Sequence, residues 1–83
     1  MIRIYGRDNC SFCEKAKAFA KMKHLEFEYD DSSEQLKYAL SNSGMRTVPV
    51  IYFDYEEWDR GMSLIGGFDD FVEWYKDRQE KFA

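Results

Sequence analysis

The 83-residue chain has one proline, one histidine and two cysteines, and it has no long apolar run. A zinc site usually needs four Cys or His ligands, so these three residues, with His24 a full helix away from both cysteines, argue against a metal centre. The apolar runs fall well short of the roughly 20 residues that span a bilayer, and no segment resembles a secretory signal. The composition therefore predicts a cytoplasmic protein with no membrane contact and no bound metal.

Positive charge is also scarce, because 12 Lys and Arg residues face 16 Asp and Glu residues and leave a net charge of −4. This balance disfavours a nucleic-acid partner or broad attraction to an anionic membrane. Basic residues nevertheless gather in the first 24 positions, which leaves room for a local anion site there. The short length predicts a single domain over residues 1–83, a monomer whose chemistry lies in a surface groove.

Hydrophobic periodicity predicts seven secondary-structure elements. Residues 1–5, 25–29, 47–53 and 62–65 are apolar or alternate with period two, which indicates strands. Helical spacing indicates three helices, over residues 11–23, between residues 32 and 44, and from residue 70 onward. The order βαβαββα opens with a parallel βαβ unit and closes with an antiparallel hairpin, so it predicts an α/β fold with a mixed four-stranded sheet and three helices.

Several residues mark the predicted ends of these helices. Ser32 with Gln35 and Asp70 with Glu73 both fit a capping box, the pattern that begins a helix. Gly44 lies where a glycine cap would end the second helix. These signals predict helix starts at Ser32 and Asp70.

The segment Asp54–Gly61 between the last two strands is polar and acidic, with Tyr55 and Trp58 among its residues. We interpret these two aromatic side chains as packing within the hairpin. The alternative is a surface that binds a protein partner.

Both cysteines lie in Cys10-Ser11-Phe12-Cys13, between the first predicted strand and the first predicted helix. A Cys-x-x-Cys pair in a βαβ unit is typical of a thiol redox site. As a purely structural disulfide it would close a very short loop and stabilise the fold by only about 2 kcal/mol. A reducing compartment would also keep it open. We therefore interpret the pair as redox-active.

The two cysteines are predicted to have different roles. At a helix N-terminus, unpaired N–H groups and the positive end of the helix dipole stabilise a thiolate, so Cys10 is the expected nucleophile. Cys13, one turn further on and more buried, would attack the mixed disulfide on Cys10 and release the reduced product. Arg7 and Lys15 either favour the Cys10 thiolate further or are solvated surface charges.

Three motifs occur in order: Arg-x-x-Cys-x-x-Cys at residues 7–13, Arg-Thr-Val-Pro at residues 46–49 and Gly-Gly-Phe-Asp-Asp at residues 66–70. Together they resemble the glutaredoxins, in particular the short dithiol members of bacteria and bacteriophages. The resemblance covers nearly the whole chain. It implies a thioredoxin-like fold in which the peptide bond before Pro49 is cis and faces the cysteines.

The resemblance also implies glutathione as co-substrate. In the family, the backbone at the position of Val48 pairs with glutathione, and the residues at the positions of Asp69 and Asp70 hold its γ-glutamyl end. Arg7 stands in place of the lysine that meets the glycyl carboxylate, and Phe12 in place of the tyrosine beside the thiols. The glutathione-binding residues implied in this way are Arg7, Phe12, Thr47, Val48, Pro49, Gly67, Phe68, Asp69 and Asp70.

Some of these residues also have a purely structural interpretation. Asp69 or Asp70 would cap the last helix, the two glycines would form a turn, and Thr47 would be an ordinary strand residue. Capping and ligand binding are compatible with each other.

The sequence leaves three functional hypotheses. The first is a glutathione-dependent thiol–disulfide oxidoreductase that reduces protein disulfides or glutathione mixed disulfides, with ribonucleotide reductase as an acceptor by family analogy. The second is an iron–sulfur cluster carrier, because Ser11 replaces the usual proline and accompanies cluster binding between two subunits in some dithiol glutaredoxins. The third is a thioredoxin-like redoxin recharged by thioredoxin reductase, against which the motif at residues 66–70 argues.

Overall fold

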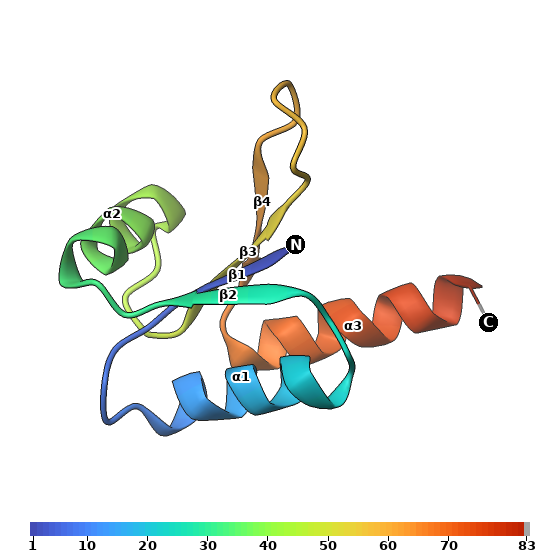
Figure 1. Cartoon of the computed structure of the whole chain (residues 1–83), viewed down its shortest axis with the longest axis horizontal. Coiled ribbons are helices and arrows are strands. Elements are labelled where there is room, and N and C mark those ends of the chain that lie inside the picture. Colours follow the sequence, from blue (N-terminus) through green and yellow to red (C-terminus); the bar gives the residue numbers. More distant parts are fainter. Residues whose placement is uncertain (83) are drawn as a thin grey trace.

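The computed structural model describes the backbone of residues 1–82 and the side chains of residues 1–78. Strands and helices follow one another in the predicted order βαβαββα (Figure 1). The elements are β1 (Ile2–Tyr5), α1 (Ser11–Met22), β2 (Phe27–Asp30), α2 (Ser33–Ser43), β3 (Val50–Asp54), β4 (Met62–Gly66) and α3 (Phe68–Phe82). The predicted α/β class is therefore confirmed.

The four strands form one mixed sheet in the order β2-β1-β3-β4. β1 runs parallel to β2, as a βαβ unit with a crossover helix requires, and antiparallel to β3. β3 and β4 form the closing antiparallel hairpin, in which Ile51 pairs with Gly66 and Tyr52 pairs with Leu64. Ile65 is thus an extra residue in β4, a β-bulge next to the start of α3.

Helices cover both faces of the sheet, with α1 and α3 on one face and α2 on the other (Figure 1). Successive strand residues point to opposite faces, so Ile51 packs under α1 and α3 while its neighbour Val50 packs under α2. The larger cluster contains Ile2, Ile4, Ala16, Ala20, Ile51 and Phe71, and the smaller one contains Leu36, Ala39 and Val50. No helix in residues 1–82 combines the length and the apolar character needed to cross a membrane.

Two strands begin two or more residues later than the sequence predicts. The second begins at Phe27 instead of residue 25, because the N–H of Leu25 donates to the carbonyl of Ala20 at 2.9 Å and closes α1. The third begins at Val50 instead of residue 47, since Pro49 has no N–H to donate to a ladder. Both differences shorten a strand and leave the topology unchanged.

Both ends of α2 have the predicted caps, but the reciprocal half of the predicted capping box is absent, because the N–H of Ser32 donates to the carboxylate of Asp30 at 2.9 Å. The hydroxyl oxygen of Ser32, its N-cap residue, accepts the N–H of Gln35 at 3.4 Å. Gly44 ends the helix in the left-handed conformation, with φ of 73°.

The predicted capping box of Asp70 with Glu73 is wrong, because α3 begins two residues earlier, at Phe68. The carboxylate of Asp70 instead reaches back and accepts the N–H of Gly67 at 3.1 Å. Asp70 therefore lies in the first turn of α3 and stabilises the start of the helix from within.

The hairpin between β3 and β4 extends away from the helices (Figure 1). The ring of Tyr55 packs against Phe53, with 4.9 Å between centroids, and the guanidinium of Arg60 lies 4.8 Å from the Tyr55 centroid. Trp58, in contrast, is 98% exposed. The interpretation as hairpin packing is thus confirmed for Tyr55 and wrong for Trp58.

Arg3 ties β1 to both neighbouring strands. Its Nε donates to Oδ2 of Asp54 at the end of β3 at 2.7 Å, and its Nη1 donates to Oε2 of Glu28 on β2 at 2.6 Å. The hydrogen bond from Arg3, together with one from the N–H of Glu56, holds the pKa of Asp54 below its ordinary value. This ion-pair network fixes the strand that leads directly into the cysteine loop.

Replacing Asp54 with Asn should lower the free energy of unfolding at neutral pH by up to about 1 kcal/mol, as expected for a partly exposed ion pair. Because the folded pKa is lowered, the carboxylate contributes stability above its ordinary pKa of 3.8, and this contribution is lost as the pH falls through the folded value. The free energies of unfolding of wild type and Asp54→Asn, measured in urea, should therefore become equal as the pH falls from about 7 to about 2. Asp59→Asn, in the same hairpin, is the control, and a difference that persists in acid would contradict this account.

Candidate active site

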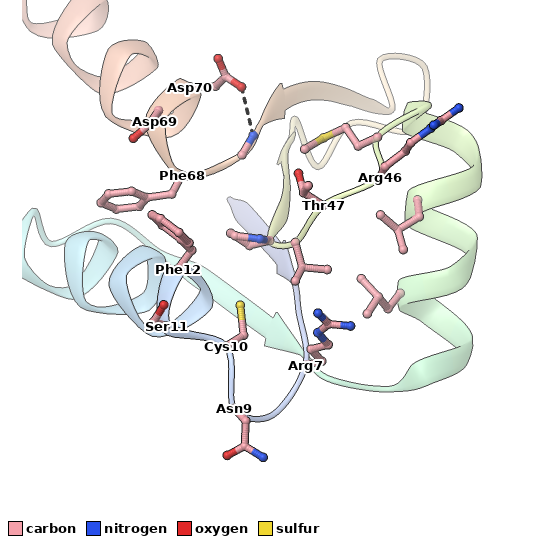
Figure 2. A pocket seen from close by; sticks show the side chains of 16 residues that line it. Arg7, Asn9, Cys10, Ser11, Phe12, Arg46, Thr47, Phe68, Asp69 and Asp70 are labelled. Carbon is pink, nitrogen blue, oxygen red and sulfur yellow. Dashed lines mark hydrogen bonds between the residues drawn. The ribbon is translucent and has the colours of Figure 1, made fainter.

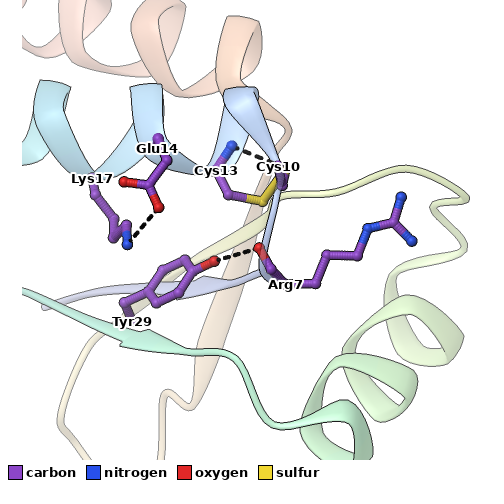
Figure 3. Close-up of a disulfide and its surroundings, with 6 residues drawn as sticks. All are labelled: Arg7, Cys10, Cys13, Glu14, Lys17 and Tyr29. Carbon is purple, nitrogen blue, oxygen red and sulfur yellow. Dashed lines mark hydrogen bonds and ion pairs between the residues drawn. A yellow bond between two sulfur atoms is a disulfide. The ribbon is translucent and has the colours of Figure 1, made fainter.

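Cys10 is the N-cap residue of α1, and its sulfur accepts the N–H of Cys13 at 3.2 Å (Figure 3). Its carbonyl accepts the N–H of Glu14 at 3.1 Å, so the helix begins directly after it. Free N–H groups at this position, and the positive end of the helix dipole, favour a thiolate. Cys10 thus lies at the start of the helix, as the sequence predicts.

A disulfide joins Cys10 to Cys13, with 5.2 Å between their Cα atoms. The two residues differ in exposure, since Cys13 is completely buried while Cys10 is partly exposed. An external thiol or disulfide can therefore reach Cys10, and Cys13 is placed to react with its neighbour.

A groove of about 670 Å³ opens beside Cys10 (Figure 2). Its walls come from the loop before α1, from α1 itself, from α2, from the segment 45–49 and from the start of α3. The groove brings together all the predicted site residues except the buried Cys13. Those that line it are Arg7, Cys10, Phe12, Thr47, Val48, Pro49, Gly67, Phe68, Asp69 and Asp70.

The peptide bond between Val48 and Pro49 is cis, as the family resemblance implies. A Cβ placed on Gly67 would lie 3.9 Å from the carbonyl oxygen of Pro49. The segment that contains the proline and the start of α3 are therefore in close contact, and together they form one wall of the groove.

Opposite charges line opposite sides of the groove. Figure 2 shows Arg7 and Arg46 on the side toward α2, and Asp69 and Asp70 on the other side, at the start of α3. The first N–H groups of α3 have no acceptor within the helix, so this end of the groove combines hydrogen-bond donors with the two carboxylates. Among the described residues, no group of three or more His, Cys, Asp and Glu side chains could hold a metal ion.

Aromatic rings flank the groove beside the disulfide. Phe12 is 49% exposed, and its ring centroid lies 6.4 Å from that of Phe68. The ammonium group of Lys15 lies 4.8 Å from the centroid of Phe12. Of the two cations considered from the sequence, Arg7 lines the groove and Lys15 packs on this ring.

The groove also contains residues to which the sequence analysis assigns no role. Arg46 adds a second guanidinium, and the signal available for it is its place directly before Thr47 in the family motif. Leu36, Leu40 and Met45 add an apolar wall. The two leucines recur at helical spacing, but this spacing gives no sign that their face of α2 reaches the groove.

Gly6, which is buried, and Tyr29, which is half-buried, lie next to Cys13, and the sequence motifs assign neither of them a role. A Cβ added at Gly6 would lie 2.7 Å from the sulfur of Cys13 and 2.5 Å from the hydroxyl oxygen of Tyr29, so the position has no room for a side chain. The Tyr29 hydroxyl donates to the carbonyl of Arg7 at 3.3 Å (Figure 3). Burial raises the pKa of Tyr29. The alternating pattern of residues 25–29 indicates only that Tyr29 belongs to a strand.

One sulfur exposed at a helix start, with its partner buried one turn further on, is an arrangement suited to disulfide exchange. Around it the chain has a thioredoxin-like fold. The solution structure of glutaredoxin from Brucella melitensis matches 92% of this chain and 78% of that protein, with a TM-score of 0.69 and 28% sequence identity. Fold and site together define a thiol–disulfide oxidoreductase.

Sequence comparison identifies the family within this class. The glutaredoxin family model matches residues 2–58. Glutaredoxin 3 of Escherichia coli strain K12 is 31% identical over 72 residues, which cover 83% of this chain and 78% of that protein. The chain belongs to the glutaredoxin family and is a thiol–disulfide oxidoreductase of the glutaredoxin type.

Buckwheat glutaredoxin, whose crystal structure is that of its complex with glutathione, has the same fold. The TM-score is 0.72 at 21% identity, and the match covers 92% of this chain and 68% of the buckwheat protein.

Proposed function

We propose that this glutaredoxin uses glutathione to reduce protein disulfides and mixed disulfides with glutathione. The observation that carries the proposal is one groove that connects the exposed sulfur of Cys10 with a cation at Arg7 and a carboxylate at Asp69. Glutathione is a tripeptide with two carboxylates and one ammonium group, and an extended tripeptide spans about 10 Å. Its charges and length suit a groove of this kind.

The two ends of glutathione have proposed partners in the groove. Arg7 would pair with the glycyl carboxylate, as a charge-assisted contact. The N–H groups of Asp69 and Asp70, in the first turn of α3, would hold the γ-glutamyl carboxylate. The Asp69 carboxylate would then bind the α-ammonium group, because that of Asp70 already accepts the N–H of Gly67.

The middle of glutathione would lie against the segment that contains the cis peptide bond. Backbone groups of Val48 would pair with the cysteinyl residue, with Thr47 and Pro49 on either side of it. The rings of Phe12 and Phe68 would cover its apolar atoms. This arrangement directs the glutathione sulfur toward Cys10.

The proposed reaction begins when the Cys10 thiolate attacks one sulfur of the substrate disulfide. The substrate S–S bond breaks, a bond to Cys10 forms, and the other sulfur leaves as a thiolate and takes up a proton. If Cys10 then carries glutathione, a second glutathione thiolate attacks that mixed disulfide, releases glutathione disulfide and restores Cys10.

If Cys10 carries a protein instead, the Cys13 thiolate attacks the Cys10 sulfur and releases the protein thiol. The Cys10–Cys13 disulfide that results is returned to the dithiol by two glutathione molecules, which leave as glutathione disulfide. Proteins that form a disulfide in each turnover, ribonucleotide reductase among them by family analogy, are the proposed substrates. We place this chemistry in the cytoplasm, where a glutathione pool is kept reduced.

Single cysteine variants test the roles in this reaction. With a small thiol carrying glutathione as substrate, Cys10→Ser should abolish turnover, because no nucleophile remains at the groove. Cys13→Ser should retain part of it, because glutathione can resolve the mixed disulfide on Cys10 directly. Steady-state turnover with glutathione and glutathione reductase measures both variants. Equal loss in the two would refute the assigned roles.

Alanine substitutions distinguish the proposed roles of the neighbouring carboxylates of Asp69 and Asp70. Asp69→Ala should raise the KM for glutathione roughly tenfold, equivalent to about 1.4 kcal/mol, and change the free energy of unfolding less than Asp70→Ala does, because Asp69 makes no capping hydrogen bond among the described residues. Asp70→Ala should lower the free energy of unfolding by about 1 kcal/mol, through the lost hydrogen bond to Gly67, with a smaller effect on KM. Steady-state kinetics and urea unfolding of the two variants serve as mutual controls, and the reverse pattern would contradict the assignment.

A further inference from the structure

A polar cluster that the reaction described above does not use lies beside the buried cysteine of the disulfide (Figure 3). The sulfur of Cys13 and the hydroxyl oxygen of Tyr29 lie 2.7 Å and 2.5 Å from the point where a side chain on Gly6 would begin. The two atoms therefore flank the same point, next to the completely buried cysteine. A phenol hydroxyl is a hydrogen-bond donor, so the site brings a donor to a buried sulfur.

Three parts of the chain hold the Tyr29 ring in this place. Tyr29 itself lies in β2, where the parallel ladder pairs it with Ile4 of β1. Its hydroxyl donates to the carbonyl of Arg7 in the cysteine loop at 3.3 Å. From α1, the ammonium of Lys17 lies 4.1 Å from the ring centroid, and Glu14 holds that ammonium at 2.9 Å. These contacts keep the hydroxyl next to Gly6, where the sulfur of Cys13 also lies.

After reduction of the disulfide, the Cys13 thiolate needs a hydrogen-bond donor, and this hydroxyl can supply one. Cys13 becomes a buried thiol, and only its thiolate can attack the mixed disulfide on Cys10. Burial in an apolar site opposes the charged form, whereas a hydrogen bond donated to it favours it. Without a donor, the resolving attack would therefore be slow.

We propose that Tyr29 is a positioning residue for the resolving step, with its hydroxyl turning from the Arg7 carbonyl to donate a hydrogen bond to the Cys13 thiolate. The inference rests on the proposed function, because it concerns the second half of the same reaction. In that step the bond between Cys10 and the substrate sulfur breaks and the Cys10–Cys13 bond forms. The substrate leaves as a thiolate and takes up the proton that Cys13 has lost.

The charges around Tyr29 are consistent with a neutral phenol that donates. Burial is the largest cause of its raised pKa, so the hydroxyl keeps its proton at neutral pH. Lys17 works against this shift, while Glu14 on α1, Asp8 in the cysteine loop and Asp31 after β2 add to it.

A two-phase reaction tests the proposal. Reduced protein is mixed with dithiobis(nitrobenzoate), which releases a coloured thiolate first when Cys10 attacks it and again when Cys13 resolves the adduct. Tyr29→Phe should leave the first phase unchanged, slow the second about threefold to tenfold, and move the pH midpoint of the second phase upward. Tyr38→Phe, which removes the hydroxyl of an exposed tyrosine on α2, is the matched control and should equal wild type in both phases.

The outcomes separate this inference from the proposed function. A Tyr29→Phe variant whose second phase keeps the wild-type rate and pH midpoint would overturn the inference. The absence of a first phase in wild type would instead contradict the role of Cys10. If Tyr29→Phe lowers only the stability of the fold, the pH midpoint of the second phase stays at its wild-type value, and this result would also overturn the inference. If Tyr29→Phe fails to fold, Lys17→Gln should still raise the midpoint by a smaller amount, and no change in it would count against the proposal.

Discussion

The chemistry of this protein depends on one constraint: the sulfur of Cys10 must lie at the free N–H groups of α1 while Cys13 stays buried one turn further on. The sheet supplies that constraint. β1 is held between β2 and β3, and Arg3 ties it to both, so the loop that follows β1 delivers Cys10 to a fixed place. On the other side, the small residues Ala16 and Ala20 bring α1 close against the sheet and seat Cys13 in the interior.

The groove exists because the topology gathers distant segments at the same end of the sheet. β1 ends at Tyr5, which pairs with Val50 at the start of β3, and Ile51 pairs with Gly66 at the end of β4. The cysteine loop, the segment that contains the cis peptide bond and the start of α3 therefore meet, although they are far apart in the sequence. The antiparallel hairpin thus connects a nucleophile to the charges that would hold its co-substrate.

Local sequence signals predict the parts of this structure that local interactions determine. Periodicity gives the element order, and the position of Cys10 follows from the start of a helix. In the local sequence, Asp70 with Glu73 fits a capping box as well as Ser32 with Gln35 does. The last helix nevertheless begins at Phe68, close after the β-bulge in β4. The approach of Tyr29 to Cys13 depends on strand register and on the missing side chain of Gly6, directly after the neighbouring strand β1, which no local pattern records. The groove residues follow from family motifs, because their proximity is purely tertiary.

The most direct test of this account is to measure which reductant supplies electrons to the protein. Turnover of a small thiol carrying glutathione would be measured with glutathione and glutathione reductase, and separately with thioredoxin reductase. The account predicts sustained turnover with glutathione and little with thioredoxin reductase, because the groove beside Cys10 is lined by Arg7 and Asp69, the proposed partners of glutathione. Turnover only with thioredoxin reductase would contradict it, and would assign Arg7 and Asp69 structural roles.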